Sequence, residues 1–427
     1  MTRPRRAAVA ALLSCCCALL GCDLVLAHPA APAALADTAP GAGAGAGSPA
    51  SFPAIGQTAP GVQQDGCVKP SAKTTDLTPW AQTFLRPEGA WALSRGAGVT
   101  VAVLGSGVDA SSGVLDSRLT LGPRLYGEGG AGRDCVGHGT FLAGLIAGHR
   151  QPGLGFAGIA PEARILAIAV TDDVGNTSAD LLAKGIRAAA DGGARVITVG
   201  VPVPGAGPEL AAAVAYAGAR GALVIAPSAP DSTGSGASDS GALPASYPDV
   251  LAVSDLGPGG ALPQAEAANS GRIDLVAPGD ALMSVGPGGA GYFTASGPSL
   301  ATAVVAGTAA LVLGYRPELT PAQLADRLKT TAYHPGTLLP DPRLGYGTVD
   351  PTAAVAAALP GKPAPAPSAA RTAVAALPPP PARPAQWHAV AVAGGVLVGT
   401  ALVAGAGAVL SRGRRRGWQP GRWTVDG

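Results

Sequence analysis

Two side chains in this sequence have the chemistry of a nucleophile and its base. His138 lies in the run Gly-His-Gly-Thr at 137–140, Ser299 follows Gly-Pro at 297–298, and each stands at the start of an apolar stretch. A serine hydroxyl is a weak nucleophile at its own pKa and becomes effective when a base removes its proton. A histidine imidazole is suited to that task near neutral pH. His138 and Ser299 are therefore the candidate residues for nucleophilic chemistry.

A third segment marks where these side chains should meet. The apolar run 99–104 is typical of a strand buried on both faces, and it ends in the turn Gly-Ser-Gly-Val-Asp at 105–109. Functional residues of parallel sheets gather at the carboxyl ends of the strands. We therefore expect this turn to lie beside the histidine and the serine.

The middle of the chain alternates short apolar runs with helical patterns. The expected strands are 99–104, 164–170, 195–199, 222–226, 250–254 and 273–277. The expected helices are 138–147, 178–190 with Ser178 as its cap, 208–220, 299–313 and 320–331. This alternation predicts an α/β fold, with a parallel sheet covered by helices on both faces.

In this order, the three segments resemble the subtilisin superfamily of serine proteases, which combine an aspartate, a Gly-His-Gly-Thr histidine and a Gly-Thr-Ser serine. The resemblance narrows to the mycosins, the membrane-anchored proteases of type VII secretion systems in actinobacteria. It rests on Pro-Trp-Ala-Gln at 79–82, Arg-Gly-Ala-Gly-Val-Thr-Val-Ala-Val at 95–103 and Asp-Cys at 134–135. It covers the chain from Gln64 onward. It implies a subtilisin-like fold, serine endopeptidase ancestry, and partners among type VII secretion membrane components or secreted peptide segments.

The sequence departs from the family at two chemically decisive positions. The position of the triad aspartate is Gly105, and that of the oxyanion asparagine is Pro230. Asp109 matches a second family aspartate outside the triad, and Asp134 lies on its own loop, so neither is expected to replace the missing carboxylate. Losing the triad carboxylate costs on the order of 10⁴ in rate, and losing the oxyanion side chain about 10²–10³. We therefore expect an inactive or very weak protease.

Three functions remain open at this point. The first is a non-catalytic mycosin that serves as a structural or docking component of a type VII secretion assembly. The second is a slow endopeptidase that uses His138 and Ser299, with a carboxylate from elsewhere orienting the histidine. The third is a peptide-binding module, because a subtilisin-like cleft holds peptides as an added strand without needing a triad.

The two ends of the chain predict export and a membrane anchor. Residues 1–27 have the basic start and apolar run of a signal peptide, with cleavage after Ala27. Lipidation at Cys22, in Leu-Leu-Gly-Cys, and retention of the leader are the alternatives. The charge-free run 389–410 is long enough to cross a bilayer, and four arginines follow it, which predicts a cytoplasmic tail and an extracellular domain.

These features divide the chain into six parts. They are a signal peptide (1–27), an Ala/Pro/Gly-rich linker (28–63), the subtilisin-like domain (64–359), a Pro/Ala-rich stalk (360–387), a transmembrane helix (388–410) and a basic tail (411–427).

The cysteines agree with an exported domain. Four of the six lie in the leader, which leaves Cys67 and Cys135. An exported chain with two cysteines usually joins them, so we expect a disulfide, with two free thiols or a metal site as the alternatives. Two ligands make a poor zinc site, and the sequence shows no metal-ligand cluster. We expect no cofactor.

The charge distribution argues against nucleic-acid binding. Eight of the 29 basic residues lie in the leader and the tail, as do two of the 27 acidic ones, so the segment between them carries four more acidic than basic residues. It shows no basic stripe of the kind that tracks phosphates.

Overall fold

The computed structural model describes residues 52–55, 66–205, 207–231, 242–262, 271–334, 336, 338–359 and 385–417. It divides the chain into one unit that ends at Leu359 and a second that begins at Pro360. The predicted signal peptide, nearly all of the first linker and most of the stalk lie outside the described residues.

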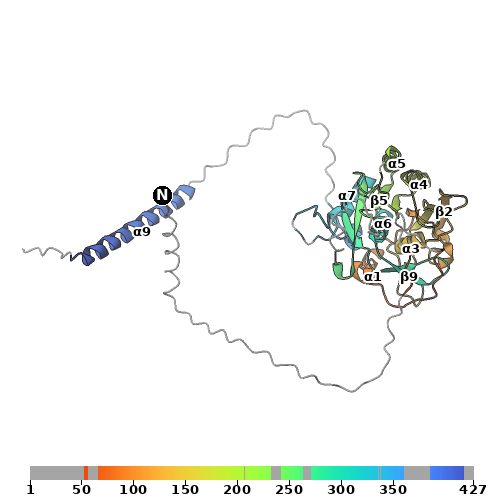
Figure 1. Ribbon diagram of the computed structural model, residues 1–427, viewed down its shortest axis with the longest axis horizontal. Helices are drawn as coiled ribbons and strands as arrows, with labels where there is room; N and C mark the ends of the chain where they lie inside the picture. Colours follow the sequence, from red (N-terminus) through yellow and green to blue (C-terminus); the bar gives the residue numbers. More distant parts are fainter. Residues whose placement is uncertain are drawn as a thin grey trace, which may run out of the picture. The chain divides into compact units, whose positions relative to one another are not determined.

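The first unit is built on a parallel sheet of seven strands (Figure 1). The strands are β1 (Thr100–Gly105), β2 (Leu119–Arg124), β3 (Arg164–Ala169), β4 (Val196–Val199), β5 (Leu223–Pro227), β6 (Val250–Leu256) and β7 (Leu275–Pro278). Their order is β2-β3-β1-β4-β5-β6-β7, and every neighbouring pair is parallel. β2 and β3 lie on one side of β1, and β4 to β7 follow one another on its other side, so β1 lies at the switch point where parallel sheets place their sites.

Helices cover both faces of this sheet. The long ones are α3 (His138–Ala147), α4 (Ala179–Asp191), α5 (Pro208–Ala219), α6 (Pro298–Tyr315) and α7 (Pro321–Thr330). Alternate residues of β1 belong to two separate cores: Val101 and Val103 pack with α3 and α6, whereas Ala102 and Leu104 pack with α4 and α5. Burial on both faces explains why the strands are continuous apolar runs.

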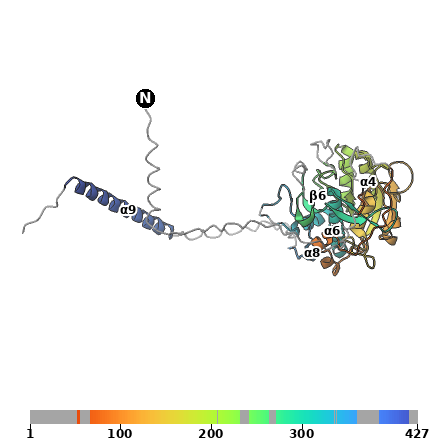
Figure 2. The same cartoon turned by 60° about the horizontal axis from the view of Figure 1, so that its bottom comes forward.

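Helix α6 is the centre of the first core. Every residue from its start to Leu313 is buried, and the helix packs against α3 and against β4 to β7 (Figure 2). Its small residues allow this approach, and Gly307 lies against Ile159. The helix is apolar enough to cross a membrane, but its burial makes it a core helix.

Short elements complete the first unit. They are α1 (Trp80–Leu85), α2 (Glu88–Trp91), α8 (Pro351–Ala356), the antiparallel pair β8 (Leu282–Val285) and β9 (Tyr292–Ala295), and three single 3-10 turns at Ala110–Ser112, Asp116–Arg118 and Pro258–Gly260. The structure also joins Cys67 to Cys135, across 68 residues of chain. This bond ties the segment before α1 to the loop that leads into α3.

Most of the expected elements are present. The helix at 138–147 begins and ends as predicted, and Ser178 caps α4 by accepting a hydrogen bond from the Leu181 N–H. The other predicted strands and helices shift by one or two residues at their ends. β2 and the short elements α1, α2, α8, β8 and β9 were not expected from the sequence. The residues of β2 are half-exposed or exposed and therefore form no apolar run.

The second unit contains one helix, α9 (Ala385–Arg415), within its described residues. The helix is 31 residues long, and its segment Gly394–Arg415 is apolar enough to cross a membrane. Its last turn carries Arg412, Arg414 and Arg415.

The close approach of α6 to Ile159 gives a stability prediction. A Cβ on Gly307 would lie 2.7 Å from the Ile159 Cβ, whereas a Cβ on Gly218 in α5 would meet nothing within 4 Å. Gly307→Ala should therefore lower the free energy of unfolding by about 1–3 kcal/mol, because a packed core cannot absorb the added methyl group. Gly218→Ala should raise it by up to about 1 kcal/mol through helix propensity. Urea unfolding of both variants measures this, and equal effects would contradict the packing described for α6.

Candidate active site

The histidine is positioned by the start of α3, beside the end of β1. Gly137 precedes the helix with a φ of 84°, and the Gly139 N–H donates to the Ser106 Oγ, directly after β1. A Cβ on Gly139 would collide with the backbone oxygen of Gly107, so this contact requires a glycine. The result is that the His138 side chain, 2% exposed, lies at the carboxyl edge of the sheet.

The serine is positioned by the start of α6. Pro298 is the first residue of the helix and Ser299 the second. The Ser299 Oγ lies 2.9 Å from the His138 Nε2, and both residues are buried. The two predicted residues, 161 positions apart in the chain, are therefore brought within hydrogen-bond distance. This is the contact that a serine nucleophile and its base require.

The other nitrogen of the histidine lacks the support that such a pair needs. The His138 Nδ1 is buried and has no hydrogen-bond partner among the described residues. β1 ends at Gly105, where a carboxylate would be expected in the family. A Cβ at Gly105 would have the Gly139 Cα as its nearest neighbour, at 3.7 Å, which is ordinary van der Waals contact. There is thus space to begin a side chain at this position.

The two nearby aspartates are occupied elsewhere. The Asp134 carboxylate accepts from the Gly137 N–H at 2.7 Å and from the Thr140 N–H at 2.7 Å and hydroxyl at 2.6 Å, which caps the start of α3. Burial raises the pKa of Asp134, and these hydrogen bonds oppose the shift. Asp109 accepts from the Ser111 N–H at 2.8 Å and from the Gly288 N–H at 2.9 Å. Both carboxylates thus organise loops.

A third aspartate, which the sequence analysis did not consider, enters the site. The Asp231 Oδ1 accepts from the Ser299 N–H at 2.9 Å, and its Oδ2 accepts from the Ser299 hydroxyl at 2.7 Å. The same Oδ2 lies 3.0 Å from the His138 Nε2. The side chain is only 3% exposed. A buried carboxylate therefore contacts both the nucleophile and the base.

The carboxyl edge of the sheet around Asp231 is acidic. Asp255 lies near the end of β6, and burial raises its pKa to about 6. The negative charges of Asp231 and Asp280 act in the same direction. The electrostatic environment of Ser299 therefore opposes further negative charge.

Pro230 and Asp231 follow the end of β5. The proline has no side-chain donor with which to stabilise an oxyanion, and the next residue supplies a carboxylate. The one hint of Asp231 in the sequence was its position directly after Pro230, and the sequence analysis did not use it. Its orientation depends on the path of the loop after β5, which no local pattern specifies.

No group of three or more His, Cys, Asp or Glu side chains able to hold a metal ion occurs within the part of the chain that the structure describes.

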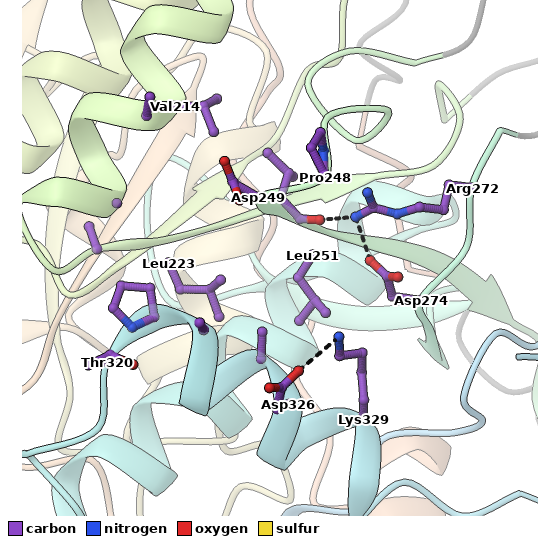
Figure 3. Close-up of a pocket in the computed structure, with 17 residues that line it drawn as sticks. Val214, Leu223, Pro248, Asp249, Leu251, Arg272, Asp274, Thr320, Asp326 and Lys329 are labelled. Atoms are coloured by element: carbon purple, nitrogen blue, oxygen red, sulfur yellow. Dashed lines mark hydrogen bonds and ion pairs between the residues drawn. The ribbon is translucent and has the colours of Figure 1, made fainter. Parts of the chain in front are cut away.

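A separate pocket of about 560 Å³ lies at the opposite edge of the sheet, between α5, α7 and the starts of β5 and β6 (Figure 3). Its floor includes Leu223 and Leu251. Arg272 pairs with Asp274 at 2.7 Å on one wall, and Lys329 pairs with Asp326 at 3.2 Å on another. The lining also includes Asp249 and Thr320.

Comparisons with known proteins identify the family of the chain. Residues 96–347 match the model of the subtilase family. The chain is 32% identical over 391 residues to mycosin-1 of Mycobacterium tuberculosis (strain ATCC 25618 / H37Rv), covering 79% of this chain and 86% of that relative.

Solved structures give the same result. The crystal structure of MycP1 from the ESX-1 type VII secretion system is similar with a TM-score of 0.60 and 29% identity, over 73% of this chain and 96% of that one. A chain in the periplasmic assembly of the ESX-5 inner membrane complex is similar with a TM-score of 0.59 and 26% identity, over 78% and 97%. The predicted subtilisin-like fold and the predicted resemblance are confirmed: the chain belongs to the subtilase family and, within it, to the mycosins.

Proposed function

We propose that this mycosin is a membrane-anchored component of a type VII secretion system whose protease site is impaired, and that it acts there by docking to other components. The observation that carries this proposal is the unpartnered Nδ1 of His138, in a scaffold whose first strand ends at Gly105 without a carboxylate. Folds persist after their sites are lost, because core packing and site chemistry depend on different residues.

The missing carboxylate matters because it fixes the tautomer of the histidine. With an aspartate on Nδ1, the Nε2 keeps a free lone pair for the serine proton, and the imidazolium that forms is stabilised. Without it, no acceptor fixes a proton on the buried Nδ1 of His138, so nothing selects the tautomer that leaves the Nε2 lone pair free. The loss amounts to about 10⁴ in rate, and the loss of an oxyanion donor adds about 10²–10³.

Helix α9 supports the proposed location. We assign residues 388–410 as the membrane span, which overlaps the candidate span Gly394–Arg415. By the positive-inside rule, the arginines at its end favour a cytoplasmic tail, with the subtilisin-like unit outside. The mycosin-like chain of the ESX-5 inner membrane complex supports the same class of partners for this chain.

A weak endopeptidase is the second candidate function. It is favoured by the 2.9 Å contact between the Ser299 Oγ and the His138 Nε2, which is the contact needed for proton transfer. The two functions differ in whether the Ser299 hydroxyl reacts.

The first prediction concerns the reactivity of Ser299. We expect the native chain, purified in detergent, to react with a fluorophosphonate probe no faster than its Ser299→Ala variant. Gly105→Asp should increase labelling, because it restores a carboxylate at the end of β1. The expected gain is one or more orders of magnitude, below the roughly 10⁴ of a complete triad, since the oxyanion side chain is still absent. Labelling is measured by in-gel fluorescence over time.

Native labelling that disappears in Ser299→Ala would overturn the assignment as an impaired protease and favour the endopeptidase. The matched control is the double variant Gly105→Asp/Ser299→Ala, because any labelling that remains in it comes from residues other than Ser299.

The second prediction concerns secretion. In the source organism deleted for this gene, the Ser299→Ala chain should restore type VII secretion as well as the native chain does, because docking does not use the hydroxyl. A chain ending at Leu359 should restore less, because it lacks α9. Secreted substrates are measured in culture filtrates by quantitative mass spectrometry. Failure of a stable, membrane-located Ser299→Ala chain to restore secretion would contradict the docking role.

A further inference from the structure

We propose that Asp231 is an internal substitute for the oxyanion: its carboxylate occupies the place where a substrate's negative oxygen would bind, and thereby holds the site closed to acylation. This deepens the proposed function, on which it rests, by naming a further determinant of reactivity. It makes the carboxylate a third obstacle to catalysis, separate from Gly105 and Pro230.

Asp231 accepts a hydrogen bond from the donor that a substrate oxyanion would need. In acyl transfer by a serine nucleophile, backbone N–H groups near the serine stabilise the developing oxyanion, including that of the serine itself. Here the Ser299 N–H already donates to the Asp231 Oδ1 at 2.9 Å. A substrate oxyanion would have to displace the carboxylate from this donor.

The position of Ser299 at the start of α6 explains why the carboxylate is stable there. Ser299 lies in the first turn of α6, a helix of 18 residues whose start is buried and has no side-chain cap from Gly297. The first N–H groups of a helix lack partners within it, and they favour a negative charge. Asp231, 68 positions earlier in the chain, supplies that charge.

A glycine at position 297 leaves the space that allows this approach. A Cβ on Gly297 would collide with the Asp231 carboxylate, and the φ of Gly297 is 148°. A glycine at this position therefore serves both the backbone conformation and the close approach of the carboxylate.

The same carboxylate also affects the base. The Asp231 Oδ2 lies 3.0 Å from the His138 Nε2, the same nitrogen that must accept the serine proton. When Nε2 carries a proton, it donates to Asp231 and has no lone pair for Ser299. The carboxylate therefore competes at Nε2 and does not take the place of the triad aspartate, which would bond to Nδ1.

The experiment compares labelling and stability in matched variants. The parent is the full-length Gly105→Asp chain in detergent, and the tested change is Asp231→Asn, which keeps the shape and replaces a negative oxygen with an N–H donor. Asp280→Asn is the control, because it removes a charge from the same edge of the sheet, whereas Asp280 is exposed and forms no hydrogen bond with Ser299 among the described residues. Each variant is tested with the fluorophosphonate probe and by thermal unfolding.

We expect Asp231→Asn to accelerate labelling by roughly 10²-fold, as expected when one oxyanion donor is gained. The same change should lower the melting temperature, because α6 loses its anionic cap. Asp280→Asn should leave the labelling rate within about 3-fold of the parent, since exposed charges interact weakly through water. A purely structural role for Asp231 would lower stability without raising the labelling rate.

The inference is overturned if the Asp231→Asn variant is labelled at the same rate as its folded parent. The same conclusion follows if neither the variant nor the parent is labelled. If circular dichroism shows that Gly105→Asp is unfolded, the native chain becomes the parent, and the same criterion applies. Labelling of the native chain itself would overturn only the proposed impairment. The inference would then still be decided by whether Asp231→Asn increases the rate.

Discussion

The start of α6 is the point on which the site depends. The helix runs through the core, so its first N–H groups face protein and not water. A buried donor without a partner costs about 1–3 kcal/mol, and Gly297 and Pro298 cannot supply a capping side chain. The carboxylate of Asp231 meets this need with a 2.9 Å hydrogen bond to the Ser299 N–H. The polarity that makes a helix start useful for binding an oxyanion also makes it a binding place for an internal carboxylate.

This arrangement explains how the fold of a protease can remain stable when its catalytic groups are absent. The sheet and its two cores depend on apolar residues of β1 and of α3 to α6, which the changes at Gly105 and Pro230 do not touch. A functional site is generally less stable than a fully satisfied one, because it holds donors ready for a substrate. Filling the oxyanion position satisfies those donors. At the start of α6, the donor that a reaction would use instead forms a hydrogen bond with Asp231.

Much of the fold could be predicted from the sequence, because strands buried on both faces leave continuous apolar runs. β1 and β6 were recognised in this way, and the Gly-His-Gly-Thr run located the start of α3 to the residue. The edge strand β2 was missed because its exposed residues interrupt that pattern. His138 and Ser299 were found because each stands in a glycine-containing motif, and close contacts in the structure require these glycines: Gly139 meets the backbone of Gly107, and Gly297 meets the side chain of Asp231.

Asp231 could not be predicted in the same way. Its role comes from a contact between the loop after β5 and the start of α6, which are 68 residues apart, and an aspartate after a strand is common in turns. The absence of a carboxylate at the triad position could be recognised from the sequence, because that position is a single residue in a fixed motif. The carboxylate that replaces the oxyanion was not, because its function depends on orientation.

The most direct test of this account is a crystal structure of the native chain at a resolution that defines the Asp231 carboxylate. The account predicts that Oδ1 lies within hydrogen-bond distance of the Ser299 N–H, and that no carboxylate contacts the His138 Nδ1. A carboxylate turned away from Ser299, with water or an ion held by the free N–H group, would contradict it.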